Sequence, residues 1–349
     1  MSSLSRLTEP CSAFFALLVA AVLPTVGGCI DNKLGTTDPG HDLDGADTDT
    51  DTDTDADTDA DGDSDTDTDS AEITSVAARL VPSVTSITTR DTVNVVVTAT
   101  WSDGSTSDIT AASTIASSDT AVLDFYEHDV GQPLFEGSVD IEVRAEGTDL
   151  DPMPLTVTMA AVKAGDLVFN EVLADPATTA DPNQDGDSDP VDDEFVEIAN
   201  AAGVTLDVSG VTLWDADLST ARHTFPSPTY LYAGQVLVVF GGGTVSRLSS
   251  PNARFFVADN EDHSLQYGVA LNNEGDRPHL VAANGATALA SAPYGDQGGP
   301  DIIDDASYVL SPEVTGSNYT HHAYVSGSVG DWSPGTHADG SAFPGPAGT

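Results

Sequence analysis

From residue 73 to the end of the chain, short apolar runs rich in Val, Ile and Thr alternate with turn residues. Residues 93–101 are the clearest example, because apolar and polar side chains alternate there before an Asp103-Gly104 turn. Similar runs recur after each turn, and no helical spacing interrupts them. Many short strands between frequent turns are typical of β-sandwiches. We therefore predict an all-β fold, with one sandwich over residues 73–162 and a second over residues 164–346.

The N-terminus has the pattern of a secretory signal peptide. Arg6 precedes an apolar run over residues 13–23, and small residues follow up to Cys29. About eleven apolar residues are too few to cross a hydrocarbon layer of about 30 Å. The sequence Val-Gly-Gly-Cys at residues 26–29 resembles the lipobox of bacterial lipoproteins. The resemblance implies that residues 1–28 are removed and that Cys29 is diacylated. The alternative is an unmodified cysteine with cleavage elsewhere.

A lipidated Cys29 predicts a membrane anchor. Stable anchoring needs two lipid signals, which the acyl chains of a lipoprotein supply. Ile30 follows the cysteine, where an aspartate would favour the inner membrane, so the lipoprotein resemblance implies the outer membrane and leaves exposure at the cell surface open. The other cysteine, Cys11, lies in the signal peptide. The mature chain therefore has no thiol for a disulfide, a thiolate nucleophile or a zinc-thiolate site.

The charge of the chain is strongly acidic. There are 57 Asp and Glu against 10 Lys and Arg, giving a formal net charge of -47. Such a charge repels phosphate backbones, so we predict that nucleic acid is not a partner. Between Asp47 and Asp69 an aspartate occupies every second position. Without hydrophobic residues this tract cannot bury a core, so residues 29–71 are predicted to be a disordered linker. Weak binding of calcium along the tract is the alternative.

The predicted first sandwich resembles the bacterial immunoglobulin-like group 2 domain. The resemblance rests on an Asp-Gly-Ser turn followed by an Asp-Ile-Thr segment, at residues 103–110, and on a Ser-Ser-Asp segment at residues 117–119. The closing strand of that family is replaced by residues 136–141, so a general immunoglobulin-like sandwich is the broader description. The resemblance implies an immunoglobulin-like fold for residues 73–162.

The predicted second sandwich resembles the lamin-tail domain, which is itself an immunoglobulin-like sandwich. The landmarks of that family appear in order along residues 164–346. They are Phe169-Asn170-Glu171, Glu194 to Asn200, Thr205 to Trp214, Leu231 to Val239, Asn272 to Val281, and Ser333-Pro334-Gly335. The resemblance implies two immunoglobulin-like sandwiches in tandem, without a catalytic role for the landmark residues.

An acidic segment between two of these landmarks is a candidate calcium site. Oxygen-bearing side chains alternate around Gly186, as in the first half of a calcium-binding loop. Hard oxygen ligands at this density favour Ca²⁺ over a transition metal. The predicted ligands are Asn183, Asp185, Asp187, Asp189 and Glu194. The alternative is a solvated acidic loop, since no helices flank the segment.

Other candidate sites are weaker. Glu171, Glu194 and Glu197 could form a carboxylate pair for hydrolysis, but we interpret them as residues that hold the fold. His321 and His322 point to opposite faces of a regular strand, so they and His337 do not predict a metal site. The chain contains none of the common hydrolase or nucleotide-binding motifs. We therefore predict no catalytic residues.

These observations predict a non-enzymatic lipoprotein of the cell envelope. It would display two β-sandwich modules for adhesion, scaffolding or binding of an envelope protein or glycan, with calcium as a stabilising ion. The alternative is a polysaccharide-binding accessory module of a secreted hydrolase system. Aromatic side chains clustered on one face would favour that alternative. The candidates are Trp214, Tyr230, Tyr232, Tyr267 and Trp332.

Overall fold

The computed structural model describes residues 71–216, 219–259, 268–301 and 304–345. In these residues the chain is almost entirely β, which confirms the predicted fold class, and the helical parts are two short 3-10 turns, η1 (Thr110–Ala112) and η2 (His322–Tyr324). No helix among them is long and apolar enough to cross a membrane. The predictions for the signal peptide, Cys29 and the acidic linker concern residues outside this part of the chain.

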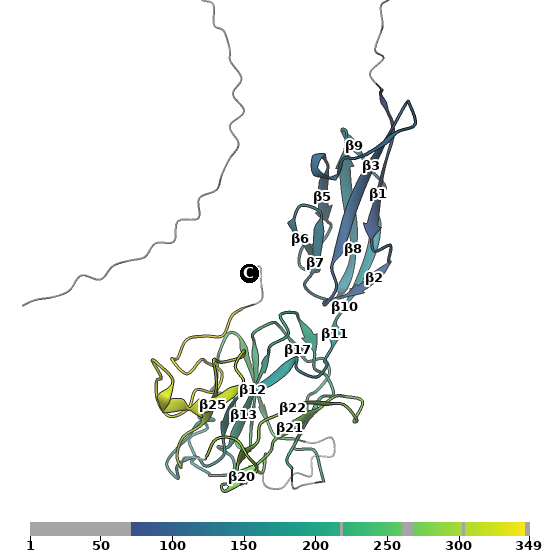
Figure 1. The fold of residues 1–349 in the computed structure, drawn as a ribbon. Coiled ribbons are helices and arrows are strands. Elements are labelled where there is room, and N and C mark those ends of the chain that lie inside the picture. The colour runs from purple at the N-terminus through teal and green to yellow at the C-terminus, as the bar shows by residue number, and fades with distance from the viewer. Residues whose placement is uncertain (1–70, 217–218, 260–267, 302–303, 346–349) are drawn as a thin grey trace, which may run out of the picture. The chain divides into compact units, whose positions relative to one another are not determined.

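The first sandwich contains ten strands in two sheets (Figure 1). The strands are β1 (Ile73–Val81), β2 (Ser86–Thr88), β3 (Val93–Trp101), β4 (Thr106–Asp108), β5 (Thr114–Ser117), β6 (Leu123–Glu127), β7 (Val130–Pro133), β8 (Gly137–Ala145), β9 (Thr148–Asp149) and β10 (Met153–Thr158). One sheet has the order β1-β3-β7-β6, with β4 paired to β3. The other has the order β2-β10-β8-β5, with β9 paired to β8.

The alternating pattern of the sequence builds the core of this sandwich. On β3 the side chains of Val93, Val95 and Val97 are fully buried, and the residues between them are more exposed. On β8 the side chains of Ile141 and Val143 face the same core from the opposite sheet. Successive side chains of a strand point to opposite faces of the sheet. One face of each sheet is therefore apolar and packs in the core, and the other is exposed to solvent.

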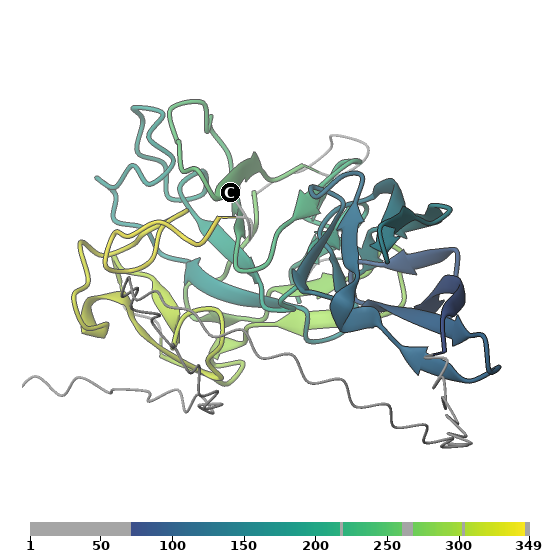
Figure 2. The ribbon, with the colours of Figure 1, turned by 90° about the horizontal axis from the view of Figure 1, so that it is seen from above.

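The second sandwich contains fifteen strands in the described residues. They are β11 (Ala160–Ala161), β12 (Leu167–Leu173), β13 (Phe195–Asn200), β14 (Leu206–Asp207), β15 (Thr212–Trp214), β16 (His223–Thr224), β17 (Tyr230–Leu231), β18 (Val236–Phe240), β19 (Ala253–Val257), β20 (Gly275–Asp276), β21 (His279–Val281), β22 (Ala288–Ser291), β23 (Tyr294–Gly295), β24 (Tyr308–Ser311) and β25 (Asn318–His321). Their largest sheet has the order β19-β18-β13-β12-β24-β25. Smaller sheets are β16-β15-β21-β22, β11-β14-β17 and β20-β23, and Figure 2 gives a second view of these strands.

The central strands of the largest sheet are covered on both faces. On β13, Val196 and Ile198 belong to the main core, whereas Phe195 and Ala199 belong to two smaller clusters. Trp332 and Phe343, from the C-terminal part of the chain, pack in those smaller clusters. Glu197 shares a strand face with Phe195 and Ala199, because side chains alternate along a strand. The C-terminal residues therefore enclose a face that would otherwise reach solvent.

Candidate functional site

Two glutamates lie opposite each other in the middle of the largest sheet. Glu171 on β12 and Glu197 on β13 are partners in the antiparallel register, and both side chains are fully buried. Like charges directly opposite on neighbouring strands destabilise a sheet. A buried pair of this kind is stable only if hydrogen bonds or protons compensate the charges.

Hydrogen bonds from the C-terminal part of the chain meet both carboxyl groups. We call residues 331–343 the C-terminal strap. The amide of Ser333 donates to Glu171 Oε1 at 2.9 Å, and the Ser333 hydroxyl donates to Glu171 Oε2 at 2.8 Å. The amide of Gly335 donates to Glu197 Oε2 at 2.7 Å. Ser307 Oγ and Asn170 Nδ2 complete the two sets of donors, at 2.5 Å to Glu171 and 2.8 Å to Glu197. The glutamates therefore fix the strap onto the sheet.

Burial changes the protonation of this network. Desolvation raises the pKa of Glu171 to about 7 and, with the charge of Glu171 beside it, raises the pKa of Glu197 well above its usual value. Glu313 contacts His337 at 3.2 Å and adds to the negative field on both glutamates. Burial also lowers the pKa of His322, whose Nε2 lies 4.0 Å from Glu171 Oε1. The carboxyl groups of this network therefore hold their protons to a higher pH than exposed glutamates do.

We expect the second sandwich to become less stable as the pH rises from 6.5 to 8. In this range Glu194, whose pKa burial raises to about 9, is ionised in the unfolded chain but keeps its proton in the folded protein, and Glu197, whose pKa is raised well above its usual value, acts in the same direction, so folding becomes costlier with pH. Burial lowers the pKa of His322, so this residue opposes the effect near pH 6.5, where it is still partly protonated in the unfolded chain, and has little influence towards pH 8. The free energy of unfolding, measured in urea, should fall by about 1.4 kcal/mol per pH unit for each such group. Glu197→Gln should reduce this slope, and an unchanged slope would contradict the assignment.

Ser328, His322 and Glu171 are the residue types of a hydrolytic triad, but they do not have its geometry. Ser328 Oγ lies 2.9 Å from His322 Nδ1. His322 Nε2 makes no hydrogen bond among the described residues, since its 4.0 Å separation from Glu171 is too long. A triad needs that hydrogen bond to orient the base. Glu171 instead accepts hydrogen bonds from Ser307 and Ser333, which hold the strap against the sheet.

The acidic loop folds around two aspartates that the sequence analysis did not select. Asp181 accepts hydrogen bonds from the amides of Asp185 and Gly186, at 3.0 and 3.1 Å. Asp193 accepts them from the amides of Asn183 and Asp189, at 3.4 and 2.9 Å. Such contacts between an aspartate and nearby amides are the usual way in which aspartates stabilise turns. In the sequence, the high density of aspartates over residues 181–193 is the feature from which these turns could have been predicted.

The five predicted calcium ligands do not form one group. Asn183 is buried, Asp187 is exposed, and the carboxylates of Asp185 and Asp189 accept backbone amides of the loop. Glu194 is buried and accepts the amide of Leu271 at 3.2 Å. Burial raises the pKa of Glu194 to about 9. In the described part of the chain no three His, Cys, Asp or Glu side chains are arranged to hold a metal. The calcium site stays a prediction, and it would require rearrangement of the loop.

Three consecutive glycines provide the surface against which this loop packs. A Cβ atom on Gly241 would overlap the carbonyl oxygen of Val191, and one on Gly242 would overlap the Asp192 carboxylate. Gly243 has a φ of 67° and faces Asp185. The close approach of the two backbones therefore requires residues without side chains.

The remaining candidate residues do not form one cluster, although the Tyr230 and Tyr232 rings both contact Phe135. His321 packs against Tyr324, His322 faces the glutamate network, and His337 packs against Phe343. Of the aromatic candidates, Trp214 lies along His279 on the β15 and β21 strands, and Tyr267 is outside the described residues. The Tyr230 hydroxyl donates to Glu136. Trp332 lines a pocket that is described below.

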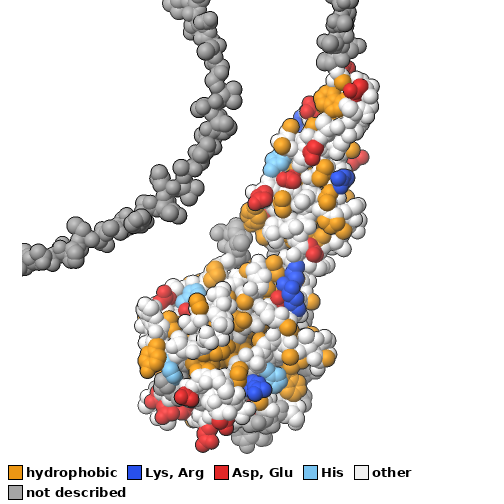
Figure 3. Space-filling view, viewed as in Figure 1, with side chains coloured by type: hydrophobic (Ala, Val, Ile, Leu, Met, Phe, Trp, Pro, Cys, Tyr) orange, Lys and Arg blue, Asp and Glu red, His pale blue; other side chains and the backbone are white. Residues whose placement is uncertain are grey.

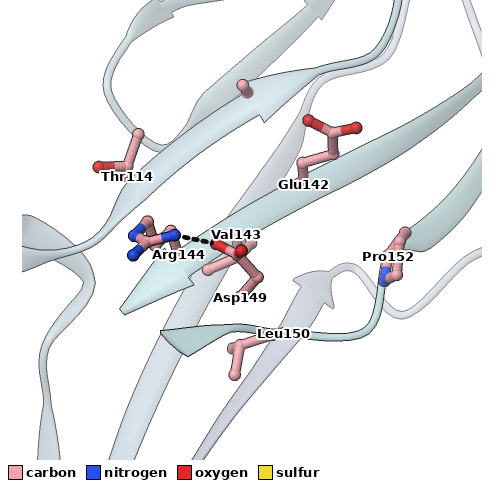
Figure 4. Close-up of a pocket in the computed structure, with 8 residues that line it drawn as sticks. Thr114, Glu142, Val143, Arg144, Asp149, Leu150 and Pro152 are labelled. Carbon is pink, nitrogen blue, oxygen red and sulfur yellow. Dashed lines mark hydrogen bonds and ion pairs between the residues drawn. The ribbon is translucent and has the colours of Figure 1, made fainter. Parts of the chain in front are cut away.

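A pocket of about 390 Å³ lies on the first sandwich (Figure 4). Arg144 and Asp149 form an ion pair of 2.8 Å in it, beside Glu142 and Thr114. Both charged side chains are well exposed, and exposed pairs contribute at most about 1 kcal/mol. On the face drawn in Figure 3, Lys and Arg side chains of the described residues form no broad basic patch.

Residues 160–296 match the model of the Lamin Tail Domain family, which is the family that the second sandwich resembles in sequence. The predicted domain, residues 164–346, extends further, and β24 and β25 after residue 303 belong to the same sheet as β12. The immunoglobulin-like group 2 resemblance of residues 73–162 stays a prediction. No curated protein matches the chain.

Several solved structures show distant similarity. Domains 5-6 of the S-layer protein SbsC are 10% identical, with 64% of this chain and 96% of that chain covered and a TM-score of 0.21. A DUF4876 family protein from Bacteroides thetaiotaomicron is 11% identical, with 54% and 53% covered and a TM-score of 0.23. The adhesin InvE of Yersinia pseudotuberculosis is 10% identical, with 74% and 72% covered and a TM-score of 0.23. TM-scores this low support no inference about this chain.

Proposed function

We propose that this chain is a non-enzymatic lipoprotein of the cell envelope. Diacylated Cys29 anchors it in the outer membrane, and residues 30–71 hold its two sandwiches away from the lipid surface. The sandwiches serve adhesion, scaffolding or the binding of an envelope partner. The lipobox-like residues 26–29 support the anchor, and the acidic residues of the linker support its role as a solvated spacer.

One observation supports the non-enzymatic assignment most strongly. The best candidate catalytic carboxylates, Glu171 and Glu197, are both fully buried. A general acid or base must come within hydrogen-bond distance of its substrate. These two groups instead accept amides of the chain's own strap, at Ser333 and Gly335. In these positions the two glutamates stabilise the second sandwich as a rigid module for display.

The anchor is tested by Cys29→Ser in the native host. The variant cannot receive the thioether lipid, so the protein should move from the membrane fraction to the soluble fraction. Immunoblots of the two fractions measure the shift, and Cys11→Ser is the matched control that should leave wild-type localisation unchanged. Metabolic labelling with palmitate should mark the wild type only. Absence of label from the wild type would contradict the anchor.

We further propose that calcium binds the acidic loop through Asn183, Asp185, Asp187 and Asp189. Glu194 was also predicted as a ligand and would have to turn out of its buried position. Uncompensated carboxylates at this density repel one another, which a divalent cation would relieve. The loop would then reorganise around the ion, because the aspartates at present accept backbone amides.

Calcium is expected to stabilise the compact unit, residues 68–349, which lacks most of the acidic linker. A ligand of the folded state adds about 2.7 kcal/mol at a hundredfold excess over its Kd, and extracellular sites bind at about 0.1–1 mM. The melting temperature should therefore rise with millimolar calcium and fall again with chelator. Asp185→Asn with Asp187→Asn should abolish the rise, whereas the charge-matched control Asp140→Asn with Glu142→Gln should keep it. An equal rise in both double variants would indicate charge screening.

A further inference from the structure

A pocket of about 350 Å³ lies in the second sandwich beside the acidic loop. Four segments distant in sequence form it: the loop around residues 181–184, residues 247–250, Phe255 on β19, and residues 332–336 of the C-terminal strap. Its volume is at the lower end of the range for small-molecule sites, which is about 300–1,000 Å³. The pocket therefore suits a compact ligand.

Two aromatic side chains supply an apolar wall. Trp332 and Phe255 are partly buried, because they pack against the cluster that contains Phe195 and Phe240. Both also line the pocket. An aromatic ring has a negative face, which attracts the weakly positive C–H groups of a ligand. The wall thus favours a ligand with an apolar side of C–H groups.

Neutral hydrogen-bonding groups make up much of the remaining lining. Gln184, Ser249 and Thr336 contribute an amide and two hydroxyls. The hydroxyl of Ser250, another lining residue, is itself buried and makes no hydrogen bond among the described residues. Hydroxyl and amide groups both donate and accept, so they match ligand hydroxyl groups.

The two charged residues of the lining, Arg247 and Asp181, carry opposite charges, and each also makes hydrogen bonds within the protein. Arg247 donates to the carbonyl oxygen of Gln184 at 3.2 Å. Asp181 accepts the amides of Asp185 and Gly186. The chain as a whole carries a net charge of -47, which opposes the approach of an anionic polymer. The pocket therefore favours a neutral ligand.

The buried glutamates hold Trp332 in place. The carbonyl oxygen of Asp331 accepts the Ser307 amide at 3.0 Å, and the Ser333 amide donates to Glu171 at 2.9 Å. The backbone is therefore fixed on both sides of Trp332. A site on a rigid backbone positions its contacts better than a free loop does. Glu171 is thus a positioning residue for this pocket.

We propose that this pocket binds a neutral sugar ring of a glycan, with Trp332 and Phe255 against its C–H face. A sugar ring combines one face of C–H groups with hydroxyls around its edge, which is the combination that the lining presents. A proline-rich peptide would also pack against aromatic side chains, but such peptides use extended grooves. This proposal goes beyond display at the envelope, and its failure would leave the fractionation result for Cys29 intact.

The test is saturation-transfer NMR with the full mature chain. The probes are three neutral disaccharides (maltose, cellobiose and lactose), digalacturonic acid, and a decaproline peptide. We expect transfer to at least one neutral disaccharide, with a millimolar Kd, and none to the acidic sugar or the peptide. Binding of digalacturonic acid or decaproline alone would overturn the proposal in favour of an anion or peptide site.

Variants assign the binding to this pocket. Trp332→Ala should weaken binding about tenfold, a change of about 1.4 kcal/mol. Trp214→Ala, on another sheet, is the matched control and should bind as the wild type does. Since Trp332→Ala removes packing, exposed Ser249→Leu provides a second variant that narrows the pocket and should also weaken binding. No transfer to any neutral disaccharide, or transfer that both pocket variants retain, would overturn the proposal.

Discussion

Replacing Glu171 with alanine is expected to lower the free energy of unfolding of the second sandwich by about 3–5 kcal/mol. The substitution leaves the Ser333 amide and hydroxyl without their buried acceptor, and it leaves the Ser307 hydroxyl only its bond of 3.2 Å to the Asp331 carbonyl oxygen. Each orphaned donor costs about 1–3 kcal/mol. Removal of the cost of burying the Glu171 carboxyl group offsets part of the loss. Urea unfolding followed by tryptophan fluorescence measures the change.

Glu171→Gln is the matched control for this substitution. Its amide oxygen still accepts the Ser333 backbone amide, and its NH₂ group can donate to the Ser333 hydroxyl, which is able to accept. The glutamine variant should therefore lose much less stability than the alanine variant. Equal losses of stability in the two variants would contradict this explanation, because hydrogen bonding to the strap would then not account for the stabilising effect of Glu171.

Replacing Gly241 with alanine is expected to cost about 3 kcal/mol and to displace the acidic loop. A Cβ atom at this position would overlap the backbone of Val191, and backbone cannot move aside as a side-chain end can. The Gly241 amide also donates to the Glu194 carbonyl at 2.8 Å, so the neighbouring strand would shift as well. Thermal unfolding gives the stability change, and limited proteolysis within residues 181–193 reports the displaced loop.

Gly242→Ala is the control that distinguishes the destabilisation by backbone overlap from the general effect of replacing a glycine with alanine. There the Cβ atom would meet the carboxylate of Asp192, which can rotate away. The cost at Gly242 should therefore be clearly smaller than at Gly241. If the two variants lose the same stability, close approach of the Gly241 backbone to the loop does not explain the glycine run.

Strands with a strong apolar pattern could be predicted from the sequence. The alternating run over residues 93–101 agrees with β3 to the residue. Its side chains Val93, Val95 and Val97 pack in a core, so burial follows the pattern of the sequence. Two of the lamin-tail landmark residues, Glu171 and Glu197, lie on neighbouring strands of one sheet.

The geometry of the candidate sites could not be predicted in the same way. The register that places Glu171 opposite Glu197 depends on an irregularity of β12 between Phe169 and Glu171, which has no local sequence signal. Glu194 matched the spacing of a calcium ligand, but its side chain lies against Leu271, 77 residues further along. Pocket contacts of Trp332 likewise depend on long-range packing of the strap. Spacing along a chain does not determine where a side chain points when its partners are distant in sequence.

The intact mass of the mature protein, extracted from membranes of its native host in detergent, tests the central proposal most directly. We predict an N-terminus at Cys29 that carries a diacylglyceryl thioether, because residues 26–29 resemble a lipobox. Fragment masses of the N-terminal peptide assign the lipid to Cys29. A mature chain that begins elsewhere, or that begins at Cys29 with no lipid mass, would contradict the assignment of this protein as an envelope lipoprotein.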